Sequence, residues 1–349
     1  MAAIKAQGIE CPFIREGDDL IKIIVDSIAN RYIQFSLKDK DIIGITESVV
    51  ARAYGKYITV DDIAESVSSI FGKNEHIILI NPIYSRNRFS MILRGIARAA
   101  SSITIVMPSF DEVGNPSGIN PFTGIDIKKY YEEICKEEQC LSTFVEDTKE
   151  AFRCNNLKVL YCGLHDYQNY SIPYQSSNDI VCTLADICKD VSPDFGVLGT
   201  NKADGERLKL YPSKELCKEV CKSVQQRIKE CFNVNAIVCI YGDGCFKDPV
   251  GGIWEFADPI TMPGYTNPEY IENTPNEVKL KFVIDEGLTD DEIKDVIRKH
   301  KNADRDKTRN VSLGTTPRIC RDLIASLMDL ISGSGDRKTP VVLIQGYFD

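Results

Sequence analysis

Glycines and aspartates follow directly after an apolar stretch in the last third of the chain. Residues 236–241, Ala-Ile-Val-Cys-Ile-Tyr, are typical of a buried strand. The residues that come next include Asp243 and Asp248, with four glycines between positions 242 and 252. Carboxylates and bare backbone N–H groups at the end of a strand suit divalent cations and phosphates. The alternative is a tight, glycine-rich turn that only connects two strands.

Asp243 is the acidic residue that we expect to matter most in this loop. It lies between Gly242 and Gly244, so a ligand can approach the backbone closely there. We expect its carboxylate to converge with those of Asp248 or Asp322 on a shared Mg²⁺ or Mn²⁺ ion. A purely structural aspartate would instead hydrogen-bond its own backbone.

Arginines gather around a predicted helix over residues 88–100. Arg94 and Arg98 lie one helical turn apart and therefore share a face, and Arg86 and Arg88 precede them. In an acidic protein this grouping favours an anionic ligand. The alternative is ion pairing with surface carboxylates.

A loop of small residues follows the last predicted helix. Backbone N–H groups of such a loop can wrap phosphate groups. The alternative is a helix stop followed by a turn. The residues of this loop are Ser332, Gly333, Ser334, Gly335 and Asp336.

Composition limits the classes of function. The chain has 349 residues and a net charge of −9, which argues against a nucleic-acid partner. It has no apolar run long enough to span a membrane and no secretory signal at its start. Its 13 cysteines include no Cys-x-x-Cys pair, so reduced thiols in the cytoplasm are the simplest account.

The predicted elements alternate between helices and strands. Apolar spacing predicts helices over 19–28, 61–71, 88–100, 179–190 and 213–232, and strands over 41–45, 77–80, 103–107, 157–162 and 236–241. Thr289-Asp-Asp-Glu292 predicts a capping box at the start of another helix. This alternation predicts an α/β or α+β chain that is large enough for two domains.

Several segments resemble, in the same order, those of the coenzyme F420-0:L-glutamate ligase (gamma-glutamyl ligase) family. They are residues 12–20, 41–56, 240–259, 321–336 and 340–346. The resemblance covers roughly 1–110 and 213–349. It implies a ligase-like domain over 1–111 and 213–349, with a subdomain of unknown role inserted at 112–212. It also implies an intertwined homodimer.

The resemblance implies a nucleotide site as well. Members of the family are similar in using GTP and a divalent metal to activate a carboxylate, which the amine of L-glutamate then attacks. Arg52 stands where the family usually has lysine, and Glu47 where it has a small hydroxyl residue. By position, the nucleotide contacts are Pro12, Phe13, Ile14, Arg15, Ser48, Arg52 and the loop Ser332–Asp336.

The expected metal site departs most from the family pattern. Ala97 falls where the family carries a metal-binding aspartate, and Asp243 is the nearest counterpart of a second one. The metal is either lost or held by a rebuilt site of Asp243, Asp248 or Asp322.

We therefore expect a cytoplasmic, ligase-like enzyme that binds GTP or another nucleotide and joins L-glutamate to the carboxylate of F420-0 or of another cofactor. One alternative is a non-catalytic protein that binds an anionic ligand and has lost the metal site. Another is a metal-independent transferase or hydrolase in which the middle region supplies new groups.

Overall fold

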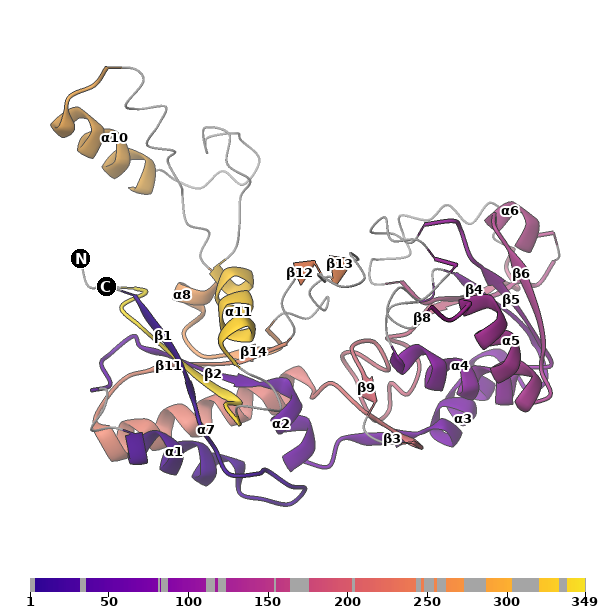
Figure 1. Cartoon of the computed structure of the whole chain (residues 1–349), viewed down its shortest axis with the longest axis horizontal. Helices are drawn as coiled ribbons and strands as arrows, with labels where there is room; N and C mark the ends of the chain where they lie inside the picture. Colours follow the sequence, from indigo (N-terminus) through magenta and orange to yellow (C-terminus); the bar gives the residue numbers. More distant parts are fainter. Residues whose placement is uncertain are drawn as a thin grey trace.

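The chain folds into two lobes, which lie side by side in Figure 1. Each lobe has its own five-stranded sheet and its own hydrophobic clusters. The computed structural model describes residues 4–31, 36–80, 82, 87–110, 117–118, 124–153, 155–163, 176–202, 205–242, 246–247, 254–255, 262–272, 287–302, 320–332 and 338–348.

The sheet of the first lobe takes its strands from both ends of the chain. Two adjacent strands, Ile42–Thr46 and Ile237–Tyr241, run parallel to each other, and each has an antiparallel strand on its other side. The hydrophobic residues of these central strands are buried on both faces, as expected for strands covered on each side. In spatial order the strands are β1 (Lys5–Ile9), β15 (Val341–Gln345), β2 (Ile42–Thr46), β11 (Ile237–Tyr241) and β14 (Gly264–Tyr265).

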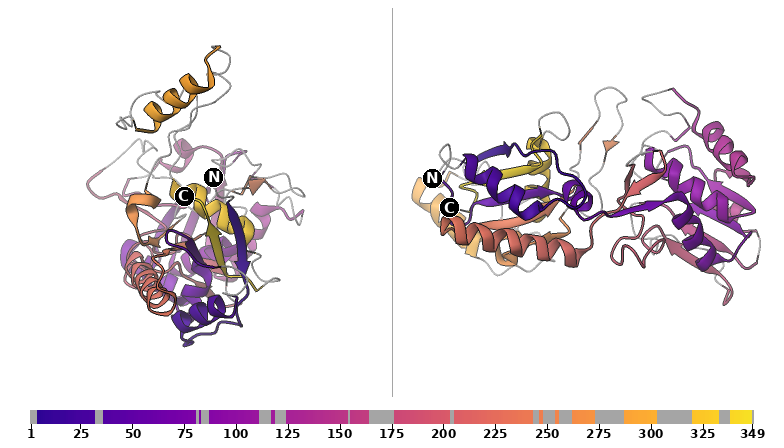
Figure 2. Two further views of the ribbon diagram at one scale, coloured as in Figure 1. Left: turned by 90° about the vertical axis from the view of Figure 1, so that its left-hand side faces the viewer. Right: turned by 90° about the horizontal axis from the view of Figure 1, so that it is seen from below.

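Helices cover both faces of this sheet (Figure 2). Because side chains alternate along a strand, Ile43 and Ile45 pack on one face and Ile42 on the other. Gly44 leaves room on the second face, where a Cβ would overlap Met328 Sδ. The helices are α1 (Leu20–Arg31), α2 (Glu47–Ala53) and α7 (Lys214–Phe232) on the first face, and α8 (Pro268–Ile271) and α11 (Cys320–Ile331) on the second.

The second lobe is a parallel α/β unit. Its strands follow the chain outward from the centre in one direction and then in the other, which is the order of doubly wound folds. The spatial order is β6 (Leu141–Val145), β5 (Ser102–Val106), β4 (His76–Ile80), β7 (Lys158–Tyr161) and β8 (Ile180–Thr183). The helices are α3 (Val60–Phe71), α4 (Asn87–Ala99), α5 (Ile127–Glu137) and the short α6 (Thr148–Ala151).

A small three-stranded sheet lies where the chain passes between the lobes. It forms from the segment that leaves α2 and the segment that leads to α7. In spatial order its strands are β3 (Tyr57–Thr59), β10 (Arg207–Lys209) and β9 (Asn201–Lys202). The remaining elements are the pair β12 (Phe246–Lys247) and β13 (Trp254–Glu255), and the helix α10 (Asp290–Asn302).

The α/β architecture predicted from the sequence is confirmed. The capping box at Thr289 is also present, since Thr289 N donates to Glu292 Oε2 at 2.8 Å and Glu292 N donates to Thr289 Oγ1 at 3.5 Å. The helix predicted over 179–190 is wrong, because residues 180–183 form β8. The spacing of Ile180, Leu184 and Ile187 suggested a helix, but a strand followed by turns packs the same residues against the core.

The boundary expected at residue 112 falls between β5 and β6, which pair with each other along their whole length. The strands β6, β7 and β8 therefore share one sheet with β4 and β5, which precede them in the chain, and the domain division at 112–212 stays a prediction. Among the described residues, the first-lobe sheet contains no strand from 112–212. None of the described helices is both long enough and apolar enough to span a bilayer.

Candidate functional site

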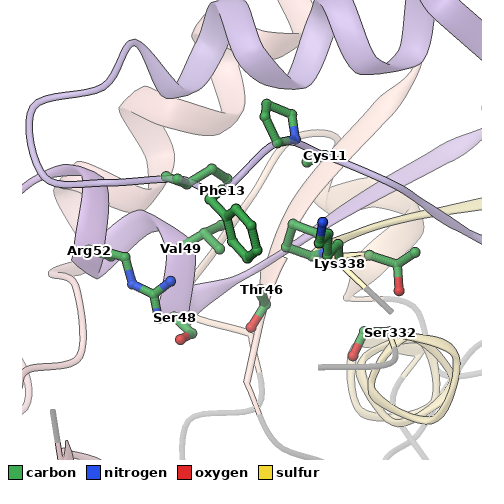
Figure 3. A pocket seen from close by; sticks show the side chains of 12 residues that line it. Cys11, Phe13, Thr46, Ser48, Val49, Arg52, Ser332 and Lys338 are labelled. Atoms are coloured by element: carbon green, nitrogen blue, oxygen red, sulfur yellow. The ribbon is translucent and has the colours of Figure 1, made fainter. Parts of the chain in front are cut away.

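Three segments that are far apart in the sequence line one pocket of the first lobe (Figure 3). Its volume is about 180 Å³. Pockets for drug-sized ligands measure about 300–1,000 Å³, so the described walls enclose only part of such a ligand. The described residues that line it are Cys11, Pro12, Phe13, Ile14, Thr46, Ser48, Val49, Arg52, Ser332, Lys338, Thr339 and Pro340.

The sheet brings these segments to one edge. β2 ends at Thr46, and the antiparallel β15 begins beside it, with Thr46 N donating to Pro340 O at 3.0 Å. The parallel β11 ends at the same edge, since Tyr241 pairs with Thr46. The glycine–aspartate segment thus begins directly after Tyr241, the residue in register with Thr46 of the pocket wall.

Backbone contacts hold the first segment over this edge. Cys11 N donates to Lys338 O at 2.9 Å, and Gly17 N donates to Ala53 O at 2.9 Å. Gly8 in β1 makes room for the third segment, because a Cβ there would lie 2.7 Å from Thr339 Cβ. The pocket walls are therefore fixed by the strand pairing and by close contacts at its rim.

The charged side chains that line the described pocket are both cationic. Arg52 makes no ion pair with any residue that the structure describes. Lys338 Nζ lies 4.4 Å from the centre of the Phe13 ring, within cation–π range. Figure 3 shows Phe13 between Arg52 and Lys338. Phe13 is open to solvent, with 67% of the residue exposed. Such a pocket suits an anion that carries an aromatic group.

Ser48 is held from outside the pocket by a residue that the sequence did not single out. Lys209 Nζ in β10 donates a hydrogen bond to Ser48 Oγ, although Lys209 itself is only 9% exposed. A buried lysine of this kind gives no local signal, because its partner lies 161 positions away along the chain. Strand pairing between β10 and β3 brings it there.

Glu47 does not line the described pocket. Its side chain is buried, and its charge acts on Cys217 of α7. Burial, then the neighbouring Cys221 and then Glu47 raise the pKa of the Cys217 thiol. The Glu47 carboxylate, at the position where the family has a small hydroxyl residue, is therefore buried and acts on α7.

Most of the residues predicted to contact a nucleotide meet at this pocket. Pro12, Phe13, Ile14, Ser48, Arg52 and Ser332 line it, and Arg15 is exposed and is not among its described lining residues. Gly333, Ser334, Gly335 and Asp336 lie outside the described residues. Sequence analysis missed Lys338 and Thr339, and the nearby loop of small residues was the signal that could have extended the prediction to them.

Arg94 and Arg98 lie in the second lobe and are engaged in ion pairs. Arg98 Nε and Arg94 Nη1 both donate to Glu138 at 2.9 Å, and Arg98 Nη1 also pairs with Asp61 at 2.5 Å. Hydrogen bonds from Arg98 first, and then from Arg94, lower the pKa of Glu138. The surface ion pairing considered as the alternative is thus what the structure contains, and anion binding by this pair stays a prediction.

Of the three predicted metal ligands, Asp322 alone lies within the described part of the chain. Asp243 and Asp248 lie outside the described residues. Asp322 is in the first turn of α11, about 15 Å from Ser332 at a rise of 1.5 Å per residue. The described residues include no group of three His, Cys, Asp or Glu side chains that could hold a metal. Ala97 is fully buried in the apolar core of the second lobe.

Comparison with known families agrees with this geometry. The sequence matches the model of a family described as F420-0:Gamma-glutamyl ligase over residues 8–346, which includes all three pocket segments and also the middle region 112–212. A search of curated proteins gave no match. The family resemblance seen in the sequence and the α/β fold that it implies are both confirmed, and this chain belongs to the F420-0:gamma-glutamyl ligase family.

Proposed function

We propose that this chain joins the amine of L-glutamate to a carboxylate on F420-0 or on another cofactor, at the cost of one GTP or another nucleoside triphosphate. The carboxylate oxygen attacks the γ-phosphorus, and the nucleoside diphosphate leaves. The amine nitrogen then attacks the acyl carbon, inorganic phosphate leaves, and the nitrogen loses a proton. The observation that carries this proposal is that residues from 11–14, from 46–52, and Ser332 with 338–340 of a ligase-family chain line one cationic pocket.

The pocket residues take defined roles in this proposal. Arg52 and Lys338 bind the phosphate groups, since the guanidinium and ammonium donors attract phosphate oxygens. Phe13 offers an exposed ring on which a base can stack, a contact worth about 1–3 kcal/mol per base in single-stranded nucleic-acid complexes. Arg52 has the fixed planar geometry that favours two hydrogen bonds to one phosphate.

In this proposal, Arg52 and Lys338 neutralise the negative charge of the phosphate groups. The described residues do not form a site for Mg²⁺ or Mn²⁺, and Asp243 and Asp248 stay predicted ligands of such an ion. Added metal is therefore a variable of the experiment. A homodimer also belongs to the proposal, and static light scattering at micromolar concentration tests it through the mass in solution.

A second candidate function is binding of the anionic ligand without catalysis. Ala97 supports it, because the position aligned with a metal-binding aspartate of the family is buried among apolar side chains. A charged carboxylate would be costly to bury there without a partner.

The test is phosphate release by the purified chain with GTP or ATP, with and without F420-0, L-glutamate and Mn²⁺. We expect release that requires the acceptor and L-glutamate, together with a higher melting temperature in the presence of the nucleotide. Arg52→Met is the inactive control. A nucleotide-dependent rise in melting temperature without phosphate release under every condition favours the binding protein. The absence of both the rise and the phosphate release would contradict both functions.

A further inference from the structure

Lys209 is a buried cation that reaches the pocket without lining it. It is 9% exposed, and charged lysines are rarely buried to this degree unless they are paired or hydrogen-bonded. Its ammonium group donates to Ser48 Oγ, and Ser48 lines the pocket beside Arg52. The lysine is contributed by β10, outside the three segments that line the pocket.

Strand pairing fixes where this ammonium group lies. Lys209 pairs with Tyr57 of β3, and Leu210 N donates to Lys56 O at 2.9 Å. Both partners follow within a few residues of the end of α2, the helix that carries Ser48 and Arg52. The small sheet thus attaches Lys209 to the same rigid unit as the pocket residues.

The contact determines what Ser48 can offer a ligand. A serine hydroxyl has one proton to donate and two lone pairs that accept. An ammonium group can only donate, so Lys209 occupies a lone pair and leaves the hydroxyl proton for another acceptor. A phosphate oxygen is such an acceptor, and the hydrogen bond is stronger when one partner is charged.

We propose that Lys209 is a positioning residue for the phosphate site, which turns the Ser48 hydroxyl into a donor directed at a phosphate oxygen of the bound nucleotide. This inference rests on the proposed function, because it assumes that the pocket takes the phosphate chain. It adds a residue from the junction between the lobes to a site that otherwise belongs to the first lobe.

The experiment is a double-mutant cycle with Lys209→Met and Ser48→Ala, read out as the dissociation constants of GTP and of inorganic tripolyphosphate. We expect Lys209→Met to weaken both ligands by about 10-fold or more, as for the loss of a hydrogen bond to a charged group. In the Ser48→Ala background the same change should weaken them by about twofold at most, because the group it orients is gone. Lys214→Met, at an exposed lysine of α7, is the matched control and should leave both constants unchanged.

A purely structural role would give a different pattern. It would lower the melting temperature and leave the ratio of dissociation constants the same in both Ser48 backgrounds. An unchanged affinity in Lys209→Met, or an equal loss with and without the Ser48 hydroxyl, overturns the inference while nucleotide binding by the wild type still supports the proposed function. Wild-type protein that binds neither ligand overturns both. If Lys209→Met does not fold, Lys209→Gln takes its place in the cycle, because the amide keeps a polar group in the buried position.

Discussion

Arg94 and Arg98 of the second lobe differ from Arg52 of the first lobe in the partners of their guanidinium groups. In the second lobe, Arg94 and Arg98 share Glu138, and Arg98 also pairs with Asp61. In the first lobe, Arg52 has no acidic partner among the described residues and lines a pocket with Lys338. Positive charge that is already neutralised holds helices together, whereas charge that is left open at a pocket is available to a ligand. The comparison therefore favours the first lobe for the anion site that we propose.

The lobes also differ in how the chain builds them. The five strands of the second-lobe sheet all come from one stretch of the chain, residues 76–183. The first lobe places Ile42 beside Ile237, and Lys5 beside Gln345. A site at the edge of such a sheet collects residues from both ends of the chain, which is why three short segments were needed to assemble one pocket.

Replacing Arg52 should break the comparison most visibly. We expect Arg52→Met to weaken GTP binding by about 10- to 150-fold, since hydrogen bonds to charged groups contribute about 1.5–3 kcal/mol. The matched variant Arg98→Met should leave the affinity unchanged, because Arg98 is paired in the other lobe. Isothermal titration measures both. Equal losses of GTP affinity in the two variants would contradict this expectation. They would favour an anion site at the second-lobe arginine cluster that the sequence predicted.

Glycines at close contacts test the packing of each lobe separately. A Cβ at Gly95 of α4 would lie 2.7 Å from Ile63 Cβ and 3.0 Å from Val60 O, neither of which can rotate away. We expect Gly95→Ala to lower the free energy of unfolding by about 1–2 kcal/mol. Gly44→Ala meets the flexible end of Met328 and should cost less than about 1 kcal/mol.

Urea unfolding measures the stability of each glycine variant, and GTP titration measures its pocket. We expect Gly95→Ala to retain the wild-type affinity for GTP, because its contacts lie within the second lobe. Adding Met328→Ala to Gly44→Ala should remove the overlap itself. A Gly95→Ala protein as stable as the wild type would show that α3 and α4 are packed less closely than the structure has them.

The sequence predicted helices and strands well where apolar residues follow one period. Most elements predicted in the second lobe have such a period. Strands over 77–80 and 103–107 and the helix over 88–100 all fall within a residue or two of the observed bounds. β8 was missed because Ile180, Leu184 and Ile187 have helical spacing and are packed by a strand and turns. Thr183 N donates to Asp186 Oδ2 at 2.9 Å, which stabilises that turn, and apolar periodicity does not report this bond.

The site was predicted less completely, because long-range contacts decide it. Family resemblance pointed to Ser48 and Arg52, and residue order alone could not show that they meet Ser332. Lys209 carries no motif, and only the pairing of β10 with β3 places it at Ser48. The edge strands β1 and β14 were missed because they are short or partly polar and owe their form to their neighbours.

Glu138→Gln tests the ion-pair side of the comparison. Glu138 is 12% exposed and accepts from both arginines, and we expect its replacement to lower the free energy of unfolding by about 1 kcal/mol. Its pKa is lowered in the folded protein from the ordinary 4.5, so the stabilisation is present above pH 4.5 and is lost as the pH falls through the folded value. Urea unfolding from pH 7 down to pH 3 measures this slope. A variant with the slope of the wild type would assign it to other carboxylates.

The smallest effect should come from His76, at the opposite end of the second-lobe sheet from the carboxyl ends of its strands. Its Nδ1 lies 2.8 Å from Ser102 Oγ and its Nε2 lies 3.2 Å from Thr104 Oγ1. Burial lowers the pKa of the imidazole below 6.5, since it disfavours the charged ring. The unfolded chain therefore binds more protons just below pH 6.5, so this contribution is complete above pH 6.5 and declines as the pH falls through the folded pKa. Urea unfolding between pH 7.5 and 5 should show that decline in the wild type and less of it in His76→Gln. The affinity for GTP should follow the wild type at each pH in that variant, and a change in affinity that tracks the His76 titration would contradict the separation of the two lobes on which the comparison rests.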